Sequence, residues 1–529
     1  DWWAWLLFSG VSLGLVASVK WVGLFSVALV GLYTLADLFI KLGDTSMPVR
    51  RYAKHWVARI IGLIIVPIII YMFSFALHFA VLNRSGDGDA QMSSLFQAGL
   101  RGSDLVDNPL EVVYGSAATL RTSAYGAGLL HSHIQSFPVG SQQQQVTTYG
   151  HKDENNYWIM ERGSNQTAAR LEAGLGLLDD PLEPLKHGST VRLFHNATKA
   201  YLHVNNLPAP MTKTALEVAC LKGEEAGHDR SYEWRVELVD DLSGRSPAEI
   251  HALTTRFHLR HVEHNCLLRA HSKNLPEWGF KQGEVVCDSE HGPGDAANIW
   301  NVEWHRNAKL PPAPPSSFRT SFTRDFIHLN AAMWTSNNAL VPDDTREDRA
   351  TSKAWEWPLM LVGMRMAGWG DDQVKFLLLG NPAVWWTSTL CILLIGILVV
   401  LYDARRRRGY NGWLPEEYEN FLFGAYVIAG GWFFHYIPFF IMGRVLYLHH
   451  YLPALYISTL GIPFVIDHCT RRATITTQRI VYSSVVMLVI CTFAYFAPLT
   501  FGYNKPIEDM RGRSWLKKWQ VVDYPLLSD

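Results

Sequence analysis

Hydrophobic residues occur along this chain in blocks. Membrane-length apolar runs flank a polar segment of about 300 residues, from about 83 to 380. An α-helix rises about 1.5 Å per residue, so each run can cross the roughly 30 Å of a bilayer's hydrocarbon core. The pattern predicts a polytopic α-helical membrane protein with seven transmembrane helices and one inserted aqueous module. The predicted spans are approximately residues 5–19, 21–40, 60–82, 383–402, 421–441, 452–466 and 480–498.

Basic residues predict the orientation of these helices. Lys and Arg gather in the 41–59 loop, in the four arginines at 405–408 and in the 471–479 connection. Alternating crossings place all three on one side, and the positive-inside rule makes that side cytosolic. The polar module, Lys20, the turn at His449 and the C-terminal tail then share the opposite compartment.

Three N-x-[ST] sequons agree with this orientation. They stand at Asn83, Asn165 and Asn196, all on the predicted non-cytosolic side. We interpret them as candidate N-glycosylation sites, since N-glycans are attached in that compartment.

Overall composition averages two unlike regions. The chain is 48% hydrophobic and carries a formal net charge of -1, so we expect no nucleic-acid partner. Three of its six cysteines, Cys220, Cys266 and Cys287, lie in the polar module, where oxidation is permitted. One disulfide with one thiol left over fits this count, and the spacing leaves the pairing open.

The polar module repeats itself. Leu-Leu-His-Ser-His at 129–133, Tyr-Leu-His-Val-Asn at 201–205 and Leu-Leu-Arg-Ala-His at 267–271 recur about 70 residues apart, and a Trp follows each about 30 residues later. Runs of alternating polarity, such as 190–195 and 257–261, are typical of half-buried strands. Three short-stranded units predict a closed three-fold structure, a β-trefoil.

Core packing is the favoured interpretation of the repeated Leu and Trp positions. The polar residues of the first repeat need not belong to a core. For them, ligand binding and a plain solvated surface are equally open interpretations. The candidate ligand-binding residues are His131, His133, Gln135, Lys152 and Asp153.

Cations and imidazoles gather at the predicted non-cytosolic membrane edge. Lys20 lies in the turn between the first two spans, where it can act as a topological anchor or as a ligand for a lipid phosphate. The connection between the fifth and sixth spans holds Arg444, Tyr447, His449 and His450. A guanidinium suits phosphate oxygens, and imidazole can donate to or protonate a leaving group. The alternative is an interfacial belt of aromatic and basic side chains.

Paired carboxylates precede the fourth span. Asp371 and Asp372 follow Gly370 just before an apolar stretch, which favours helix capping over a general-base role. Asn381 ends the same stretch, and we group it with the candidate phosphate ligands.

Several motifs resemble known families. The 129–138 repeat motif, the Gln run at 142–145 and His-Lys-Asp-Glu-Asn-Asn-Tyr-Trp at 151–158 resemble the MIR repeat, which forms a β-trefoil. Ser-Val-Lys-Trp-Val-Gly at 18–23, Phe-Ile-His-Leu-Asn at 326–330, Asn-Asn-Ala-Leu-Val-Pro at 337–342, the 369–382 stretch and His-His-Tyr-Leu-Pro-Ala at 449–454 resemble the fungal protein O-mannosyltransferases. Gly-Trp-Gly-Asp-Asp at 368–372 is most similar to their second subfamily.

The resemblance implies a GT-C glycosyltransferase of the endoplasmic reticulum membrane. Such an enzyme transfers mannose with inversion from dolichyl phosphate mannose to Ser or Thr hydroxyls of secretory proteins, and it needs no tightly bound cofactor and no metal. The resemblance also implies a heterodimer with a first-subfamily mannosyltransferase. The trefoil would then present acceptor polypeptide or hold mannosylated product.

One departure from the family concerns the catalytic base. The family carries an Asp-Glu pair in its first lumenal loop, and the chain opens at Asp1 inside an apolar run. We therefore expect about four further helices and the acidic pair upstream of Asp1, with Asp371 and Asp372 as weak substitutes. The expected domains are 1–82 (three helices), 83–108 (linker), 109–310 (lumenal MIR β-trefoil), 311–382 (lumenal linker and membrane edge), 383–502 (four helices) and 503–529 (lumenal tail).

A second hypothesis treats the helices as an inert anchor. The module would then be a tethered receptor for glycans or unfolded polypeptides. A tether needs only one span and has no reason to place Lys and Arg at non-cytosolic turns, so the sequence favours the transferase.

Overall fold

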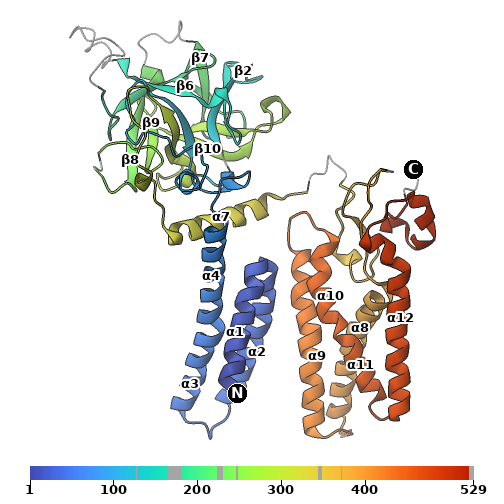
Figure 1. Ribbon diagram of the computed structural model, residues 1–529. Coiled ribbons are helices and arrows are strands. Elements are labelled where there is room, and N and C mark those ends of the chain that lie inside the picture. The colour runs from blue at the N-terminus through green and yellow to red at the C-terminus, as the bar shows by residue number, and fades with distance from the viewer. Residues whose placement is uncertain are drawn as a thin grey trace. The chain divides into compact units, whose positions relative to one another are not determined.

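The computed structural model describes residues 1–126, 128–164, 182–222, 230–245, 248–342, 348–370, 372–410 and 412–522. The chain forms two compact units. One consists of Asp1–Phe75 with Ala339–Asp529, and the other is Ala76–Asn338. Figure 1 shows the helices of the first unit and the strands of the second.

Seven helices among the described residues are long and apolar enough to cross a membrane, which confirms the predicted number. Several of them are continuous only through a local change of helix type. Val49–Val81 passes through a π-helical turn, and Leu448–Thr470 joins a short 3-10 helix to two α-helices. The α-helices are α1 (Trp2–Val19), α2 (Leu24–Leu42), α3 (Val49–Ile60), α4 (Val66–Val81), α8 (Pro382–Arg407), α9 (Pro415–Tyr436), α10 (Leu452–Thr459), α11 (Gly461–Thr470) and α12 (Ile475–Phe501).

Glycine lets α1 approach the third span closely. A Cβ on Gly10 would lie 1.9 Å from the carbonyl oxygen of Gly62, and one on Gly14 would lie 2.6 Å from Ile70. Small residues at such crossings allow helix backbones to pack directly, which drives helix association where no hydrophobic effect operates. The close contact fixes α1 against the third span.

The inserted module is a β-trefoil, as the repeats predict. Antiparallel pairings β1–β4, β4–β5, β5–β8, β8–β9, β9–β12 and β12–β1 close a six-stranded barrel. Hairpins β2–β3, β6–β7 and β10–β11 meet over one end through β3–β7, β7–β11 and β11–β3 pairs. The strands are β1 (Ala117–Thr122), β2 (Leu129–Ser136), β3 (Gln144–Tyr149), β4 (Trp158–Arg162), β5 (Thr190–His195), β6 (Ala200–Pro208), β7 (Leu216–Lys222), β8 (Trp234–Asp241), β9 (Thr255–His261), β10 (Leu267–Asn274), β11 (Gly283–Asp288) and β12 (Trp300–Arg306).

One tryptophan from each repeat fills the trefoil core. Trp158, Trp234 and Trp300 are fully buried. Their indole nitrogens donate hydrogen bonds to main-chain oxygens of the Leu-containing hairpin strands, at 2.9 Å to Leu130, 3.4 Å to Leu202 and 2.8 Å to Leu268. Each indole therefore buries its apolar surface without leaving its N–H unpaired. The packing interpretation of the repeated Leu and Trp positions is confirmed.

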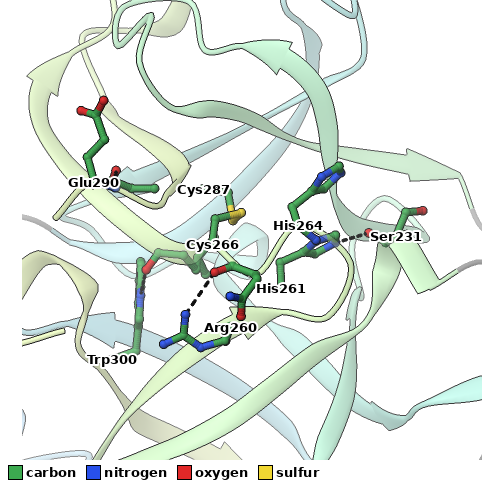
Figure 2. Close-up of a disulfide and its surroundings, with 11 residues drawn as sticks. Ser231, Arg260, His261, His264, Cys266, Cys287, Glu290 and Trp300 are labelled. Carbon is green, nitrogen blue, oxygen red and sulfur yellow. Dashed lines mark hydrogen bonds between the residues drawn. A yellow bond between two sulfur atoms is a disulfide. The ribbon is translucent and has the colours of Figure 1, made fainter. Parts of the chain in front are cut away.

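Cys266, directly before β10, and Cys287 of β11 form a disulfide (Figure 2). It links the start of the third hairpin to the end of β11. Cys220 is a buried free thiol, and burial raises its pKa to about 12. The pairing that the spacing left open is thus settled, and the third cysteine packs as a small apolar side chain.

Two segments beside the trefoil complete the second unit. They form α5 (Ser94–Ala98) and α7 (Phe322–Ala339), and α7 had not been recognised as a helix in the sequence. Leu95 of α5 packs with Leu105, Leu253 and Phe318 in a small apolar cluster at the trefoil surface. In the first unit, β13 (Met364–Arg365) and β14 (Leu377–Leu378) form a short hairpin before α8.

His195 predicts that acid destabilises the trefoil. Burial lowers its pKa to about 4, against 6.5 when exposed, although the Asn155 carbonyl opposes this shift. The unfolded chain binds the proton more readily, so the stabilisation is complete above pH 6.5 and is lost as the pH falls toward 4. The expected loss is about 3 kcal/mol. It can be measured by calorimetry of the purified chain across this range.

His195→Gln should flatten that pH profile. The exposed His151 provides the matched control, and His151→Gln should retain the slope of the original chain. Equal slopes for all three proteins would show that His195 does not bind its proton differently in the folded and unfolded states.

Candidate functional site

Lys20 lies in a tight turn that ends α1. Its backbone is extended, with φ -163° and ψ 146°, and the 3-10 turn Trp21–Gly23 begins directly after it. A Cβ on Gly23 would lie 2.4 Å from the carbonyl oxygen of Val16, so only glycine fits this reversal. Trp21 donates a hydrogen bond of 2.9 Å to the hydroxyl of Tyr71 on α4. The turn therefore holds the exposed Lys20 at the end of the helix pair.

The 443–451 connection between α9 and α10 is held by main-chain contacts. The Val445 amide donates to the Leu340 carbonyl at 3.0 Å, and the Ser352 amide donates to the Leu446 carbonyl at 2.9 Å. Tyr447 forms a β-bridge with Thr351. These contacts give an irregular loop a defined backbone, so the polar side chains that it carries start from fixed positions.

Three rings of this connection stack on one another. Tyr447 lies 5.5 Å from His449 and 5.8 Å from His450 between ring centroids, and the two imidazoles are 4.4 Å apart. Nδ1 of His450 is 3.0 Å from the Tyr447 amide nitrogen. His450 is buried and His449 is half-buried, so the first ring supports the second.

Both candidate cations act on this pair of imidazoles. The positive charges of Lys20 and Arg444 lie within electrostatic reach of both His449 and His450. The two cations come from connections more than 400 residues apart, and the fold brings them to one place in the first unit. Two cations, two imidazoles and a phenol in one cluster can hold a phosphate group by charge-assisted hydrogen bonds. We call Lys20, Arg444, Tyr447, His449 and His450 the headgroup cluster.

Aromatic side chains pack against the buried imidazole of the cluster. Trp357 is fully buried, lies 6.4 Å from His450 between ring centroids and donates a hydrogen bond of 2.9 Å to the Ser352 hydroxyl. Trp385 of α8 donates to the Trp357 carbonyl at 2.7 Å. Sequence reasoning missed Trp357, because one Trp among the twenty in this chain carries no signal of its own.

Asn381, grouped in the sequence with the candidate phosphate ligands, caps α8 (Pro382–Arg407). Its Oδ1 accepts hydrogen bonds from the amides of Ala383 and Val384, at 3.0 and 3.4 Å. Its Nδ2 donates to the Val489 carbonyl of α12 at 2.9 Å. Both ends of the amide are thus used to start α8 and to tie it to α12, which leaves the side chain little capacity for a ligand.

The predicted capping role of the carboxylate pair is wrong for Asp372. Asp371 lies outside the described residues. Asp372 is exposed in a turn, no helix begins at it, and β14 follows before Asn381 starts α8. An apolar run directly after an acid indicated a cap, but nine residues of turn and strand intervene. Asp372 remains a weak candidate for the catalytic base.

The polar candidates of the first trefoil repeat divide into two groups. His131 and His133 are buried, with ring centroids 5.5 Å apart, and Nδ1 of His131 lies 2.8 Å from the Asn156 side-chain oxygen. Burial lowers the pKa of both rings, which are therefore neutral at pH 7. Gln135, Lys152 and Asp153 are exposed.

A partly buried group of hydrogen-bonded polar side chains in the hairpin cap was not anticipated. Oε1 of Gln143 accepts hydrogen bonds from His203 at 2.7 Å and from Asn205 at 2.8 Å. Asn205 also donates to Glu217 at 2.9 Å. Gln143 stands within the run of four glutamines, whose repetition in the sequence hides which member contacts the second repeat.

The sequons lie at the edges of the second unit. Asn83 and Asn196 are half-buried. Nδ2 of Asn83 donates to the Ala80 carbonyl, and Oδ1 of Asn196 accepts from Lys199 at 3.3 Å. Asn165 lies outside the described residues.

Family comparisons cover the two membrane parts and the module separately. Residues 1–83 match the family described as dolichyl-phosphate-mannose-protein mannosyltransferase. Residues 127–300 match the MIR domain, and residues 322–519 match the C-terminal four-helix region of protein O-mannosyltransferases. Both membrane parts thus match transferases, which is evidence against an inert anchor.

Individual relatives extend over nearly the whole chain. Mannosyltransferase 2 of Candida albicans is 43% identical over 99% of this chain and 69% of its own length. Mannosyltransferase 3 of Saccharomyces cerevisiae is 39% identical over 99% of this chain and 70% of its own. The solved S. cerevisiae Pmt1-Pmt2 complex, bound to the sugar donor, contains a chain that is 31% identical, with a TM-score of 0.76 over 99% of this chain and 70% of that chain. The chain therefore belongs to the protein O-mannosyltransferase family, with second-subfamily character and dolichyl-phosphate-mannose-protein mannosyltransferase activity.

Proposed function

We propose that the headgroup cluster holds the phosphate of dolichyl phosphate mannose and the charge that develops on dolichyl phosphate as it departs. The observation that carries this proposal is the convergence of Lys20 and Arg444 on His449 and His450. A relative of this chain has been solved with its sugar donor bound, which supports a donor site in this fold.

The cluster serves the leaving group in this mechanism. The acceptor hydroxyl oxygen attacks the anomeric carbon and displaces the phosphate oxygen with inversion, while a base takes the hydroxyl proton. Negative charge then grows on the departing phosphate, where fixed cations stabilise the transition state more than the ground state. The five cluster side chains serve the leaving group in this proposal, and the base is a different residue.

The trefoil supplies a surface for acceptor polypeptide or mannosylated product. Gln135, Lys152 and Asp153 are its accessible polar candidates, since His131 and His133 are buried. The Asp153 carboxylate lies 3.5 Å from His131, so a ligand at the exposed residues would contact a side chain anchored to the buried ones.

The protein functions in the endoplasmic reticulum membrane, in this proposal, with the trefoil, the headgroup cluster and the tail in the lumen. Charge distribution supports this orientation, because three basic connections lie on the predicted cytosolic side. It places Asn83, Asn165 and Asn196 where N-glycans can be attached. A first-subfamily mannosyltransferase is the proposed partner, by analogy with the Pmt1-Pmt2 complex.

Arg444→Ala should lower kcat/KM for mannosyl transfer by about 100-fold, because it removes a donor that stabilises developing charge. Arg444→Lys should lose less, about tenfold, since it keeps the charge and loses the forked geometry. The assay measures transfer from dolichyl phosphate mannose to a Ser/Thr-rich peptide, by the full polypeptide with its first-subfamily partner.

The exposed Lys505 provides the control for this experiment. Lys505→Ala removes one positive charge from the tail and should leave kcat/KM unchanged. If Arg444→Ala also retains full activity, the assignment of Arg444 to the leaving group is wrong.

Asn381→Ala should affect the stability of the protein and not its binding of the donor, in contrast to Arg444→Ala. Loss of the cap should cost about 1 kcal/mol of stability and lower the thermal midpoint, while the KM for dolichyl phosphate mannose stays unchanged well below that midpoint. Thermal denaturation and donor titration of one preparation separate these effects. A raised KM for dolichyl phosphate mannose with an unchanged thermal midpoint would instead identify Asn381 as a phosphate ligand.

A further inference from the structure

A cavity of about 500 Å³ lies within the second unit, where α5 and the start of α7 meet the trefoil. Figure 1 shows α7 alongside the trefoil end of this unit. Polar and aromatic side chains of all three elements face the cavity. They include Ser94, Arg121, Tyr125, Arg256, Arg324 and His328.

The lining is basic. Three arginines contribute to it, and none of the described lining residues carries a carboxylate. The acids that interact with these arginines are Glu303, Asp240 and Asp325, which lie outside the lining. The guanidinium groups therefore line the cavity, and the carboxylates that interact with them do not.

Arg121 is held in place by a buried acid. Its guanidinium donates to Oε1 of the fully buried Glu303 at 2.9 Å and to the Ala90 carbonyl at 2.6 Å. The Ser94 hydroxyl donates to the same carboxylate oxygen at 3.0 Å. A guanidinium has five N–H donors, so those not used in these bonds remain for a ligand.

Arg256 and Arg324 complete the basic lining in different ways. Arg256 forms a two-pronged pair with Asp240, one bond of which measures 2.7 Å. Arg324 is exposed on the first turn of α7. Its neighbour Asp325 instead accepts a hydrogen bond of 2.7 Å from the Thr320 hydroxyl. Two arginines are thus preorganised, and the third can move toward a ligand.

His328 and Tyr125 form an uncharged wall. Their ring centroids are 5.0 Å apart, and Nε2 of His328 lies 3.1 Å from the Gln91 carbonyl oxygen. Burial lowers the pKa of His328 and raises that of Tyr125, so both are neutral at pH 7. His328 belongs to the Phe-Ile-His-Leu-Asn motif, to which the transferase mechanism gives no role.

The cavity lies beside the end of a membrane span. The third span ends at Val81, and Phe79 in its last turn contacts Phe96 of α5 at 5.3 Å and Phe322 of α7 at 6.2 Å between ring centroids. Ser321 and Thr323, on either side of Phe322, line the cavity. An arginine-lined cavity thus adjoins aromatic side chains at the end of a span, and lipid phosphates lie at the ends of membrane spans.

We propose that this cavity binds the phosphate group of a membrane lipid. Arg121, Arg256 and Arg324 contact the phosphate oxygens, and the Ser and Thr hydroxyls contact the ester oxygens. The lipid's acyl chains leave toward Phe79 and Phe322. The proposal goes beyond the transferase function and does not depend on the headgroup cluster.

Native mass spectrometry of the full chain in detergent tests the proposal, because it counts bound lipids. The probe is short-chain phosphatidic acid, with the matching diacylglycerol and inorganic phosphate as comparisons. The original chain should retain phosphatidic acid, should not retain diacylglycerol, and should bind inorganic phosphate at least about tenfold more weakly because phosphate lacks the acyl contacts.

Two variants locate the bound lipid. Arg324→Gln removes an exposed charge, so the fold is expected to persist, and Ala124→Trp fills the cavity without changing charge. Each should remove one bound phosphatidic acid per chain. Arg319→Gln removes an exposed arginine that lies outside the lining. It should not change the number of bound phosphatidic acid molecules.

Three outcomes would overturn the proposal. In the first, Arg324→Gln and Ala124→Trp both retain the full number of bound lipids. In the second, Arg319→Gln loses as much lipid as Arg324→Gln, which would indicate non-specific charge attraction. In the third, inorganic phosphate binds as tightly as the lipid, which would make the ligand a soluble anion.

Discussion

Placement of positive charge at helix ends is the constraint on which the proposed donor site depends. A cation within hydrocarbon is costly, whereas one at a turn can reach water or a lipid phosphate. Lys20 and Arg444 both occupy turns, and the fold directs both to His449 and His450. The reversal at Gly23 and the main-chain bonds of Val445 and Ser352 hold these turns in place. In the proposed function, a misplaced cation would lose its effect on a developing charge.

The trefoil is stabilised by the same arrangement of side chains in each of its three repeats. Each repeat must bury a large apolar surface and still satisfy the polar groups that go with it. An indole with its N–H bonded to a hairpin carbonyl does both, and three copies fill the core of the barrel. Buried imidazoles such as His195 add hydrogen bonds between segments and make the module sensitive to acid.

Periodic signals in the sequence predicted the architecture well. The number of spans, the trefoil and the core tryptophans were all predicted from repeated patterns. A repeated pattern can be recognised even when one copy departs from it. Single-residue roles were harder to predict. Asn381 and Asp372 stand nine residues apart, on either side of a short apolar stretch, and only the backbone decides that the first starts α8. Trp357 and Gln143 act through contacts with distant segments, which leave no local pattern.

The two basic sites differ in how their arginines are held, and the difference suits different tasks. Arg121 and Arg256 are backed by acids, which fix their geometry and lower the net charge that a ligand meets. Such an arrangement favours steady occupancy, since little ordering remains to be done on binding. Lys20 and Arg444 lie in connections between helices, near imidazoles and a phenol. In the proposed function, the positive charge of the cluster favours the transition state, in which the phosphate takes on additional charge.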